Sequence, residues 1–321
     1  MGCNYIGCMA KLLDEVMECP LCGHTSTRDE FTGTDLEHGF PGRFPIVRCI
    51  HCGLAYDRLV PAPFDLADAY PQDYGAYAIA PQKKYSIFFR LMSILLFGGR
   101  PAYFNVPVLD CPVPGARMLE VGVGSGWEAS LFKERGWNCY GLDLISSTLR
   151  AASAYGIVPV RGYADCPPFA DRVFDLIVAS NVVEHVYSPK RALESYFRIL
   201  RPGGRLIVSL PNFDSWARRL FNAFYSLLSL PRHLVHFNKK SLYSGLASAG
   251  FTEIQIRSTP LPTVFVGSLL LKLGVDYHRP KRSRLLWLVM VAGFPLDLLS
   301  YLFGSGDVLL AVCVKPKTVK Y

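Results

Sequence analysis

The stretch that most constrains the fold of this chain is residues 116–126, which read A-R-M-L-E-V-G-V-G-S-G. Met118, Leu119 and Val121 form a short apolar run of the kind that makes a buried parallel strand. The glycines that follow have no Cβ, so the backbone can turn tightly and a ligand can approach it closely. Residues 127–135 then have a helical pattern, and the free N–H groups at the start of that helix point toward whatever lies over the turn.

The spacing of the glycines distinguishes between two kinds of nucleotide site. A dinucleotide-binding turn has the pattern G-x-G-x-x-G, but the position of its third glycine is Trp127 here. The observed E-x-G-x-G-x-G resembles motif I of the class I S-adenosylmethionine-dependent methyltransferases. The resemblance implies that Glu120 contacts the methionine end of this cofactor and that Gly122, Gly124 and Gly126 let the nucleoside lie close to the backbone.

Later landmarks of the same family occur in the expected order. Asp143 ends the next predicted strand, where a carboxylate can accept both ribose hydroxyls. The resemblance further implies that Ala164 and Asp165 bracket the adenine and that Asn181, at the exit of the fourth strand, belongs to the cofactor site. A strand–turn–helix unit without a cofactor is the alternative interpretation of the motif.

From residue 116 onward the pattern alternates between strands and helices, which predicts an α/β fold with a doubly wound parallel sheet. The predicted strands are 116–122, 138–143, 157–161, 174–180, 205–211, 251–258 and 307–315. Seven strands that finish in an antiparallel pair are the Rossmann-like layout of class I methyltransferases, and the resemblance covers about 115–259 and 307–316.

The chain is long enough for this domain and a small additional module. We expect a module at 1–60, a linker with a lid helix at 61–114, and a methyltransferase domain at 115–321. The domain carries two predicted helical insertions, at 213–237 and 260–306. In the first of them, Trp216, Leu220, Phe224 and Leu227 recur at helical spacing.

The expected module contains two C-x-x-C-G turns, one at residues 19–23 and one at 49–53. Each turn presents two thiolates on one side, which is typical of tetrahedral zinc, and residues 44–48 are predicted to form the strand that leads into the second turn. The candidate ligands of a structural zinc are Cys19, Cys22, Cys49 and Cys52. A remnant ribbon that folds without metal is the alternative.

The net charge of +8 is concentrated in the last third of the chain. Residues 1–212 contain 20 Lys and Arg against 21 Asp and Glu, and residues 213–321 contain 14 against 5. The basic cluster at 278–284 precedes an apolar segment, a combination that suits contact with anionic lipid. We therefore hypothesise that the two insertions cover a small-molecule or lipid-linked acceptor and touch a membrane surface. A closed helical cap or a dimer face would bury the same residues equally well.

Candidate catalytic residues lie at the carboxyl ends of the predicted strands, where such sheets bind ligands. Glu184 and His185 leave the fourth strand together, and His233 and His236 follow the fifth. Histidine titrates near neutrality and suits a general base, so His185 and then His236 are the first candidates, with Glu184 beside them. Similar quinone O-methyltransferases bind a divalent cation through E-x-x-E-H. Asn181 replaces the first acid here, so we predict no catalytic metal.

The predicted function is methyl transfer from S-adenosylmethionine to a sugar, quinone, polyketide-like or lipid-linked acceptor. An RNA methyltransferase with a zinc module is one alternative, but the fourth-strand exit S-N-V-V-E-H lacks the N-P-P-Y pattern, and we do not expect nucleic acid as a partner. A catalytically inactive binding protein is the other. Ten cysteines without an export signal predict a cytoplasmic chain, and the hypothesis above adds a contact with the membrane surface.

Overall fold

The computed structural model describes residues 13–62, 102–103, 106–261, 264–275, 295–296, 298–299 and 302–317. The predicted lid helix at 83–99 and the basic cluster at 278–284 lie outside the described residues. Within these ranges, the helices are all too short or too polar to cross a bilayer.

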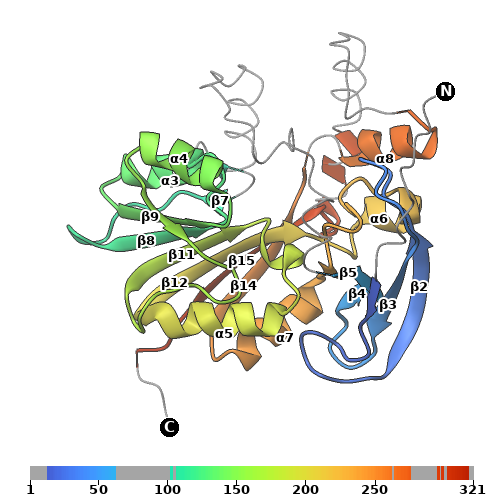
Figure 1. Ribbon diagram of the computed structural model, residues 1–321, viewed down its shortest axis with the longest axis horizontal. Coiled ribbons are helices and arrows are strands. Elements are labelled where there is room, and N and C mark those ends of the chain that lie inside the picture. The colour runs from blue at the N-terminus through green and yellow to red at the C-terminus, as the bar shows by residue number, and fades with distance from the viewer. Residues whose placement is uncertain are drawn as a thin grey trace, which may run out of the picture.

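A seven-stranded mixed sheet forms the centre of the molecule (Figure 1). Its order is β10-β9-β8-β11-β12-β15-β14, and β15 runs antiparallel to both of its neighbours. The strands are β8 (Arg117–Val121), β9 (Asn138–Asp143), β10 (Val158–Arg161), β11 (Phe174–Ser180), β12 (Leu200–Pro211), β14 (Thr252–Thr259) and β15 (Val308–Val314). This order and the antiparallel β15 confirm the predicted α/β class and all seven predicted strands.

Helices cover both faces of this sheet (Figure 1). The helices α3 (Trp127–Lys133) and α4 (Ser146–Ala154) lie on one face, and α5 (Pro189–Ile199) and α7 (Lys239–Ser248) lie on the other. Asn238 begins α7 through a capping box with Ser241, as the sequence indicates. The sheet is therefore doubly wound, and its carboxyl edge carries the loops that precede these helices.

One strand begins earlier than predicted. β12 starts at Leu200 and includes the Pro-Gly-Gly segment, which the sequence pattern assigns to a turn before the strand. Phe174 pairs with Leu200 but Leu176 pairs with Arg205, so the register shifts where the glycines bulge out of the ladder.

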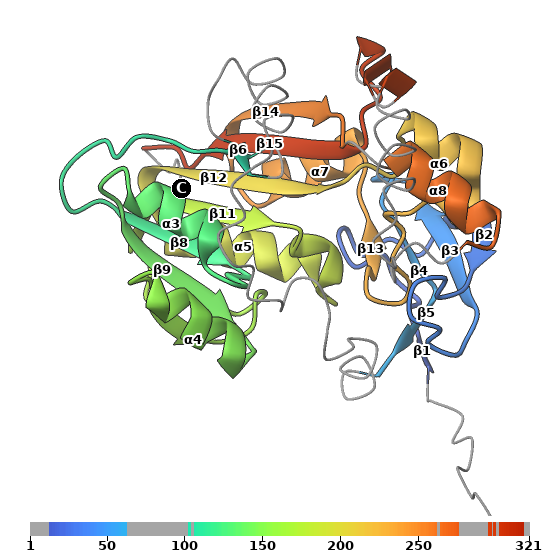
Figure 2. The same cartoon turned by 90° about the horizontal axis from the view of Figure 1, so that it is seen from above.

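The N-terminal segment, residues 13–62, forms most of a second, smaller sheet. β2 (Thr27–Gly33), β3 (Phe44–Cys49) and β4 (Ala55–Asp57) are joined at the edge by β13 (Val235–His236), which comes from the insertion at 213–237 (Figure 2). Two short antiparallel pairs complete the described strands: β1 (Leu13–Glu15) with β5 (Leu59–Pro61), and β6 (Ala102–Tyr103) with β7 (Val106–Pro107).

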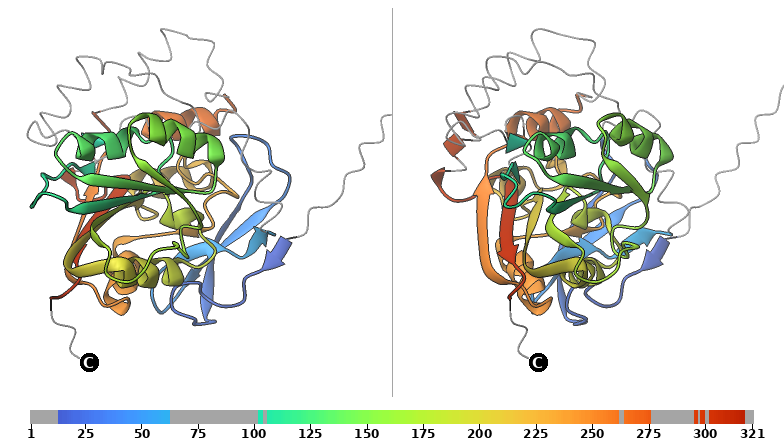
Figure 3. Two further views of the ribbon diagram at one scale, coloured as in Figure 1. Left: turned by 60° about the vertical axis from the view of Figure 1, so that its left-hand side comes forward. Right: turned by 90° about the vertical axis from the view of Figure 1, so that its left-hand side faces the viewer.

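One hydrophobic core continues from the small sheet into the large one. Phe44, Leu54 and Tyr56 of the N-terminal segment belong to the same buried cluster as Leu193 of α5 and Leu242 of α7. A separate cluster fills the opposite face of the large sheet, under α3 and α4. Figure 3 shows the small sheet beside the large one.

The insertion at 213–237 differs from its predicted amphipathic helix. α6 spans only Trp216–Phe221, a 3₁₀ turn η4 covers Asn222–Phe224, and Asn222 has a positive φ of 50°. The predicted stripe is also wrong, because α6 buries Ala217 and Phe221 and leaves Trp216 and Leu220 exposed. α8 (Val264–Lys272) packs on α6 through Phe265, whose ring lies 5.0 Å from that of Phe221.

Candidate functional site

The glycine turn joins β8 to α3 at the carboxyl edge of the sheet. Gly122, Gly124 and Gly126 have φ of 69°, 49° and 78°, in the left-handed region that glycine tolerates best. A Cβ on Gly122 would lie 2.5 Å from the Val182 side chain, and one on Gly126 would lie 2.5 Å from the Ala152 backbone. Packing as well as ligand access therefore requires glycine at these two positions.

Asp143 lies directly beside this turn. The Gly124 N–H donates to Asp143 Oδ2 at 3.1 Å, and the Ile145 N–H donates to Oδ1 at 3.0 Å. The carboxylate is only partly buried. It is thus fixed at the end of β9 with lone pairs left over for hydroxyl donors.

Glu120 is buried, with 4% of its surface exposed, and accepts a hydrogen bond from the Ala129 N–H at 2.8 Å. It lies beside Glu128 of α3, which is also buried and whose Oε1 has no hydrogen-bond partner in the described part of the chain. Burial, followed by the neighbouring Glu128, raises the pKa of Glu120 well above its ordinary value, and burial raises the pKa of Glu128 to about 8. Two adjacent buried carboxyls favour a proton or a cation between them.

The remaining predicted cofactor residues lie on neighbouring strand exits. Ala164 and Asp165 occupy the loop after β10, between the bridged residues Tyr163 and Cys166. Asn181 follows β11 with a positive φ of 52°, and its N–H donates to the Ser209 carbonyl at 2.8 Å. The order β10-β9-β8-β11 brings these loops to one edge of the sheet.

Glu184 and His185 belong to a 3₁₀ turn, η3 (Val183–His185), that leaves this edge. Among the residues that the structure describes, neither carboxylate oxygen of Glu184 has a hydrogen-bond partner, although only 1% of the residue is exposed. His185 Nδ1 donates to the Arg232 carbonyl at 2.9 Å, and His233 Nδ1 donates to the Leu227 carbonyl at 3.0 Å. Glu184, His185 and His233 each offer a ligand atom, and these atoms all lie within 4.8 Å of one another.

Burial dominates the ionisation of this cluster. It raises the pKa of Glu184 to about 8 and lowers that of His185 to about 4. Burial and the neighbouring His185 also hold the pKa of His233 well below its ordinary value. At neutral pH the two imidazoles are therefore neutral, and each keeps one unprotonated ring nitrogen.

His236 is positioned differently from His185. Its Nε2 lies 3.0 Å from Asp57 Oδ1, and its ring stacks on Phe213 at 5.1 Å. Asp57 is fully buried, and burial raises its pKa to about 6 against the opposing effect of His236. The sequence gives no sign of this partner, because Asp57 precedes His236 by 179 residues.

A cavity of about 10 Å³ lies among these groups, which is the room of a single water molecule. Glu184, His233 and His236 contribute its polar wall. The rest of the wall is mainly apolar and comes from Pro211, Phe213, Tyr225, Leu227, Leu228 and Val235. The cavity thus combines a hydrophobic lining with three titratable groups.

Ion pairs hold the N-terminal segment against the insertion that carries His233. Arg232 is fully buried and donates to Asp35 Oδ2 at 3.0 Å and to Glu37 Oε2 at 2.6 Å. Arg48 likewise donates to Asp214 Oδ1 at 2.9 Å. None of these pairs is predicted from the sequence, since single charges far apart in a chain give no pairing signal.

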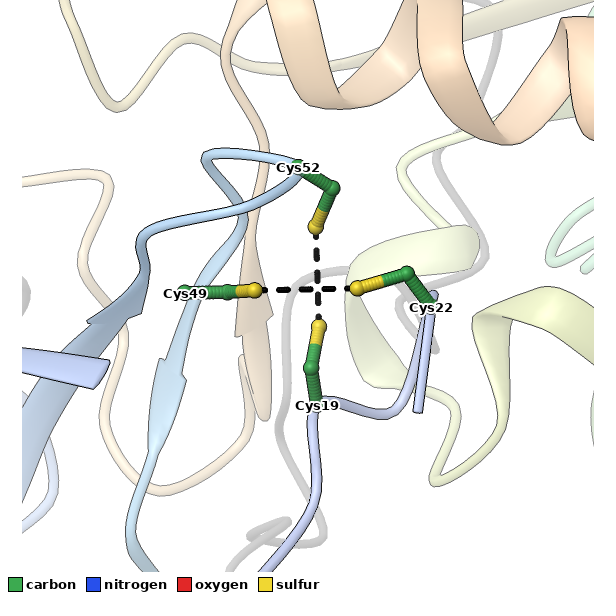
Figure 4. Close-up of side chains that lie close together, drawn as sticks. All are labelled: Cys19, Cys22, Cys49 and Cys52. Atoms are coloured by element: carbon green, nitrogen blue, oxygen red, sulfur yellow. Dashed lines mark hydrogen bonds between the residues drawn. The ribbon is translucent and has the colours of Figure 1, made fainter. Parts of the chain in front are cut away.

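Figure 4 shows the side chains of Cys19, Cys22, Cys49 and Cys52 pointing toward a common centre. The Cys19–Cys52 and Cys22–Cys49 sulfur separations are both 3.6 Å. A tetrahedral zinc with Zn–S bonds of about 2.3 Å has sulfur–sulfur edges of about 3.8 Å, so this arrangement fits four thiolate ligands and is too long for disulfides. The pKa of Cys19 is lowered to about 5, chiefly by its hydrogen bond with Cys52.

Residues 103–256 match a family model described as a methyltransferase domain. The chain is 34% identical over 158 residues to the ubiquinone/menaquinone biosynthesis C-methyltransferase of Vibrio vulnificus, covering 44% of this chain and 60% of that protein. It is 33% identical over 124 residues to the demethylmenaquinone methyltransferase of Renibacterium salmoninarum, covering 37% of this chain and 52% of that protein. The chain therefore spans little more than half the length of these two relatives.

Among solved structures, phosphoethanolamine N-methyltransferase 2 of Haemonchus contortus, in complex with S-adenosylmethionine, gives a TM-score of 0.49. It is 18% identical, and the superposition covers 90% of this chain and 69% of that one. The family match and the two curated relatives agree with the sheet order and the glycine turn described above. Residues 103–256 therefore resemble a methyltransferase domain, and the sheet that they build has the layout of the class I methyltransferases.

Proposed function

We propose that the chain transfers a methyl group from S-adenosylmethionine to a small apolar acceptor of the quinone type. The observation that carries this proposal is the contact between Gly124 and Asp143, which joins the glycine turn to the carboxylate expected to bind ribose. The two quinone-pathway relatives support the choice of acceptor.

The proposed cofactor site uses the turn and the strand exits around it. Asp143 would accept the ribose hydroxyls, and Ala164, Asp165 and Asn181 would line the adenine side. Glu120 and its neighbour Glu128 would hold the ammonium group of the methionine end, which fits the unpartnered Oε1 of Glu128. Gly122 and Gly126 would keep the backbone close to the nucleoside.

When bound, S-adenosylmethionine supplies a methyl group that its sulfonium already activates. The protein then has to align the acceptor in line with the sulfur–methyl bond and to receive any proton that the acceptor loses. We assign this second task to His185 at the exit of β11, whose ring is neutral at neutral pH, and Glu184 lies protonated beside it. His236 lines the same cavity as Glu184, and we propose that its pairing with Asp57 holds that part of the cavity wall in place.

Calorimetric titration with S-adenosylhomocysteine tests the cofactor site. Asp143→Ala should lower the affinity at least 10-fold, because one good hydrogen-bonding carboxylate contributes about 1.4 kcal/mol or more. Asp175→Ala is the matched control, since Asp175 lies near the start of β11, at the opposite edge of the sheet. Wild-type protein that binds no S-adenosylhomocysteine, or an Asp143→Ala variant that binds it normally, would refute the site.

A labelled-methyl assay tests the acceptor. Purified protein should label a short-chain demethylquinol and leave RNA unlabelled. Labelling of RNA alone would overturn the proposed acceptor class while leaving the cofactor site intact.

We further propose that Cys19, Cys22, Cys49 and Cys52 bind a structural zinc. Four thiolates leave no open coordination position, so the metal would stabilise the small sheet rather than react. The purified chain should contain one zinc per molecule that Cys49→Ser removes, and a metal-free protein of unchanged stability would contradict this.

The predicted membrane contact also stays a proposal. Exposed apolar side chains gather on α6 and α8, namely Trp216, Leu220 and Leu269, and Leu273 follows α8. These residues suit the surface of an anionic bilayer, because apolar side chains can enter the headgroup boundary. Flotation with anionic vesicles at low salt should recover the wild type and lose a Leu220→Gln, Leu273→Gln variant. Absence of wild-type protein from the vesicle fraction would exclude the contact.

A further inference from the structure

We infer that the cavity beside Glu184 and His233 is a binding site for one O–H group, which belongs either to a buried water molecule or to the methyl acceptor. The cavity lies at the carboxyl edge of the large sheet, where β12 ends and η3 leaves β11. Glu184 lines it from η3, and His233 and His236 line it from the insertion at 213–237. The Leu234 N–H donates to the Glu184 carbonyl at 2.9 Å, which fixes these two segments against each other.

The size of the cavity limits the part of a ligand that can enter it. A volume of about 10 Å³ is the room of one water-sized group and is too small for a ring or a chain. The wall between the polar groups is mainly apolar and includes Phe213 and Leu227. Because a buried water needs about 2–4 polar partners, an oxygen in this cavity has to bond to Glu184, His233 or His236.

Glu184 supplies the hydrogen-bond donor of the site. Only 1% of the residue is exposed, and neither side-chain oxygen has a hydrogen-bond partner within the described ranges. Burial raises the pKa of Glu184 to about 8, so at neutral pH the group is mainly a carboxylic acid with one O–H to donate. A buried donor of this kind is stabilised by an oxygen that accepts from it.

His233 supplies the hydrogen-bond acceptor. Its Nδ1 lies 3.0 Å from the Leu227 carbonyl, which can only accept, so the ring carries its proton on Nδ1. Burial holds the pKa of His233 well below its ordinary value, so the ring is neutral and Nε2 keeps its lone pair. The site therefore combines one donor with one acceptor.

The spacing of the two groups fits a single bridging oxygen. A side-chain oxygen of Glu184 and a ring nitrogen of His233 lie within 4.8 Å of each other, but the two side chains form no direct hydrogen bond. An oxygen that makes two hydrogen bonds of about 2.8 Å at a tetrahedral angle joins atoms about 4.5 Å apart. One O–H group can therefore accept from Glu184 and donate to His233 at the same time.

His236 forms the third polar part of the wall, and its ring is held from two sides. Its Nε2 lies 3.0 Å from Asp57 Oδ1, and the ring stacks on Phe213 at 5.1 Å. The Arg218 guanidinium in turn lies 4.3 Å from the centre of the Phe213 ring. These contacts fix the His236 ring, so this part of the wall keeps its place when a ligand enters or leaves.

The donor and the acceptor together select the chemistry of the ligand. A carbonyl or ether oxygen only accepts and leaves His233 unsatisfied, and an ammonium group only donates and leaves the Glu184 O–H unsatisfied. An O–H group satisfies both. In the setting of the proposed function, on which this step rests, a hydroxyl of the acceptor displaces the water and anchors the acceptor at the exit of β11.

Crystallography of the full chain tests the site independently of methyl transfer. Wild-type crystals should show one water whose oxygen lies within about 3.2 Å of both Glu184 and His233. Glu184→Gln keeps a donor and should keep this water, and Glu184→Met, which fills similar space without a polar group, should lose it. Oxygen-17 relaxation dispersion in solution should count one long-lived water fewer in Glu184→Met than in Glu184→Gln.

Soaking the crystals in phenol distinguishes the two sources of the O–H group. The phenol oxygen should replace the water between Glu184 and His233, and methoxybenzene, which has the same ring without the O–H, should not. A water that stays in place at saturating phenol would overturn the step that involves the acceptor and leave a resident water site.

Two results would overturn the site itself: wild-type crystals without density between Glu184 and His233, or a water that contacts only one of them. The wild-type density decides even if Glu184→Met does not fold. Calorimetry with S-adenosylhomocysteine on the same protein separates failure of this site from failure of the proposed function, because the proposed cofactor contacts do not include His233.

Discussion

Two regions of this molecule are assembled in different ways. At the carboxyl edge of the large sheet, the turn at 122–126 and Asp143 come from consecutive strand–helix units and meet through backbone geometry. The N-terminal segment and the insertion at 213–237 are far apart in the chain. At their junction, the contacts are buried ion pairs and the pairing of β13 from the insertion with β4 from the N-terminal segment. The first region depends on local conformation, and the second depends on buried charge.

Arg232→Met breaks the junction most directly, and we expect the largest effect from it. Removing one partner of a buried ion pair leaves Asp35 and Glu37 without their cation, at a cost of about 3–5 kcal/mol in the free energy of unfolding. Arg201→Met, which breaks the partly exposed pair with Asp175, should cost about 0–1 kcal/mol. Urea denaturation compares the two, and similar losses would remove the distinction between the regions.

Gly126→Ala tests the role of local conformation at the glycine turn. The added Cβ meets the Ala152 backbone at 2.5 Å while φ stays near 78°, so strain and overpacking together should cost about 3 kcal/mol. Gly115→Ala is the matched control, because its φ is 88° and nothing lies within 4 Å of its Cβ. It should cost about 1 kcal/mol, and thermal unfolding of both variants checks the difference.

Glu128→Gln tests how the free energy of unfolding depends on pH at the glycine turn. The pKa of Glu128 is about 8 in the folded chain against an ordinary value of 4.5, so the folded state holds the proton more tightly. Its stabilising contribution is complete below pH 4.5 and is lost as the pH rises through 8, with a slope of up to about 1.4 kcal/mol per pH unit.

The glutamine variant should therefore gain stability relative to the wild type between pH 5 and pH 8, by about 3 kcal/mol in total. Urea denaturation at a series of pH values measures the slope. Glu134→Gln, an exposed substitution just after the same helix, should leave the slope unchanged. Parallel curves for wild type and Glu128→Gln would show that Glu128 is ionised in the folded chain.

Asn238→Ala is expected to have the smallest effect. Asn238 caps α7, and its side-chain amide nitrogen also donates to the Gly53 carbonyl at 3.1 Å and to Asp214 Oδ2 at 3.0 Å. Loss of these interactions should cost about 2 kcal/mol, and loss of the simple cap of α5 in Ser188→Ala about 0.5–1 kcal/mol. Asn238→Asp keeps the cap but places a carboxylate against that of Asp214, so in chemical denaturation it should cost at least as much as Asn238→Ala.

The same contrast explains what the sequence predicts well. The period of apolar residues and the spacing of glycines are set within a few residues of the chain. The seven strands, the turn at 122–126 and the capping of α7 by Asn238 therefore follow from local pattern. Even the early start of β12 is a local error, caused by glycines that bulge out of the ladder without ending it.

The junction is not predictable in this way. Nothing near Asp57 in the sequence indicates that it pairs with His236, and nothing near Arg232 indicates Asp35. The cluster of Glu184, His185 and His233 is visible in the sequence only as separate residues, because its convergence depends on where the insertion packs. For α6, apolar spacing predicts a longer helix with Leu220 buried, but the chain turns at Asn222 and the helix buries Ala217 and Phe221.

The pairing of β13 with β4 has a consequence for how the protein is made. Tyr56 and Ala55 leave the ribosome long before their partners Val235 and His236, and β8 to β12 are synthesised in the interval. Closing so long a loop is slow, and an unfilled strand edge invites pairing with other chains. During synthesis the edge of β4 therefore stays unpaired until β13 has been made, and the edge is protected only once the insertion at 213–237 packs against it.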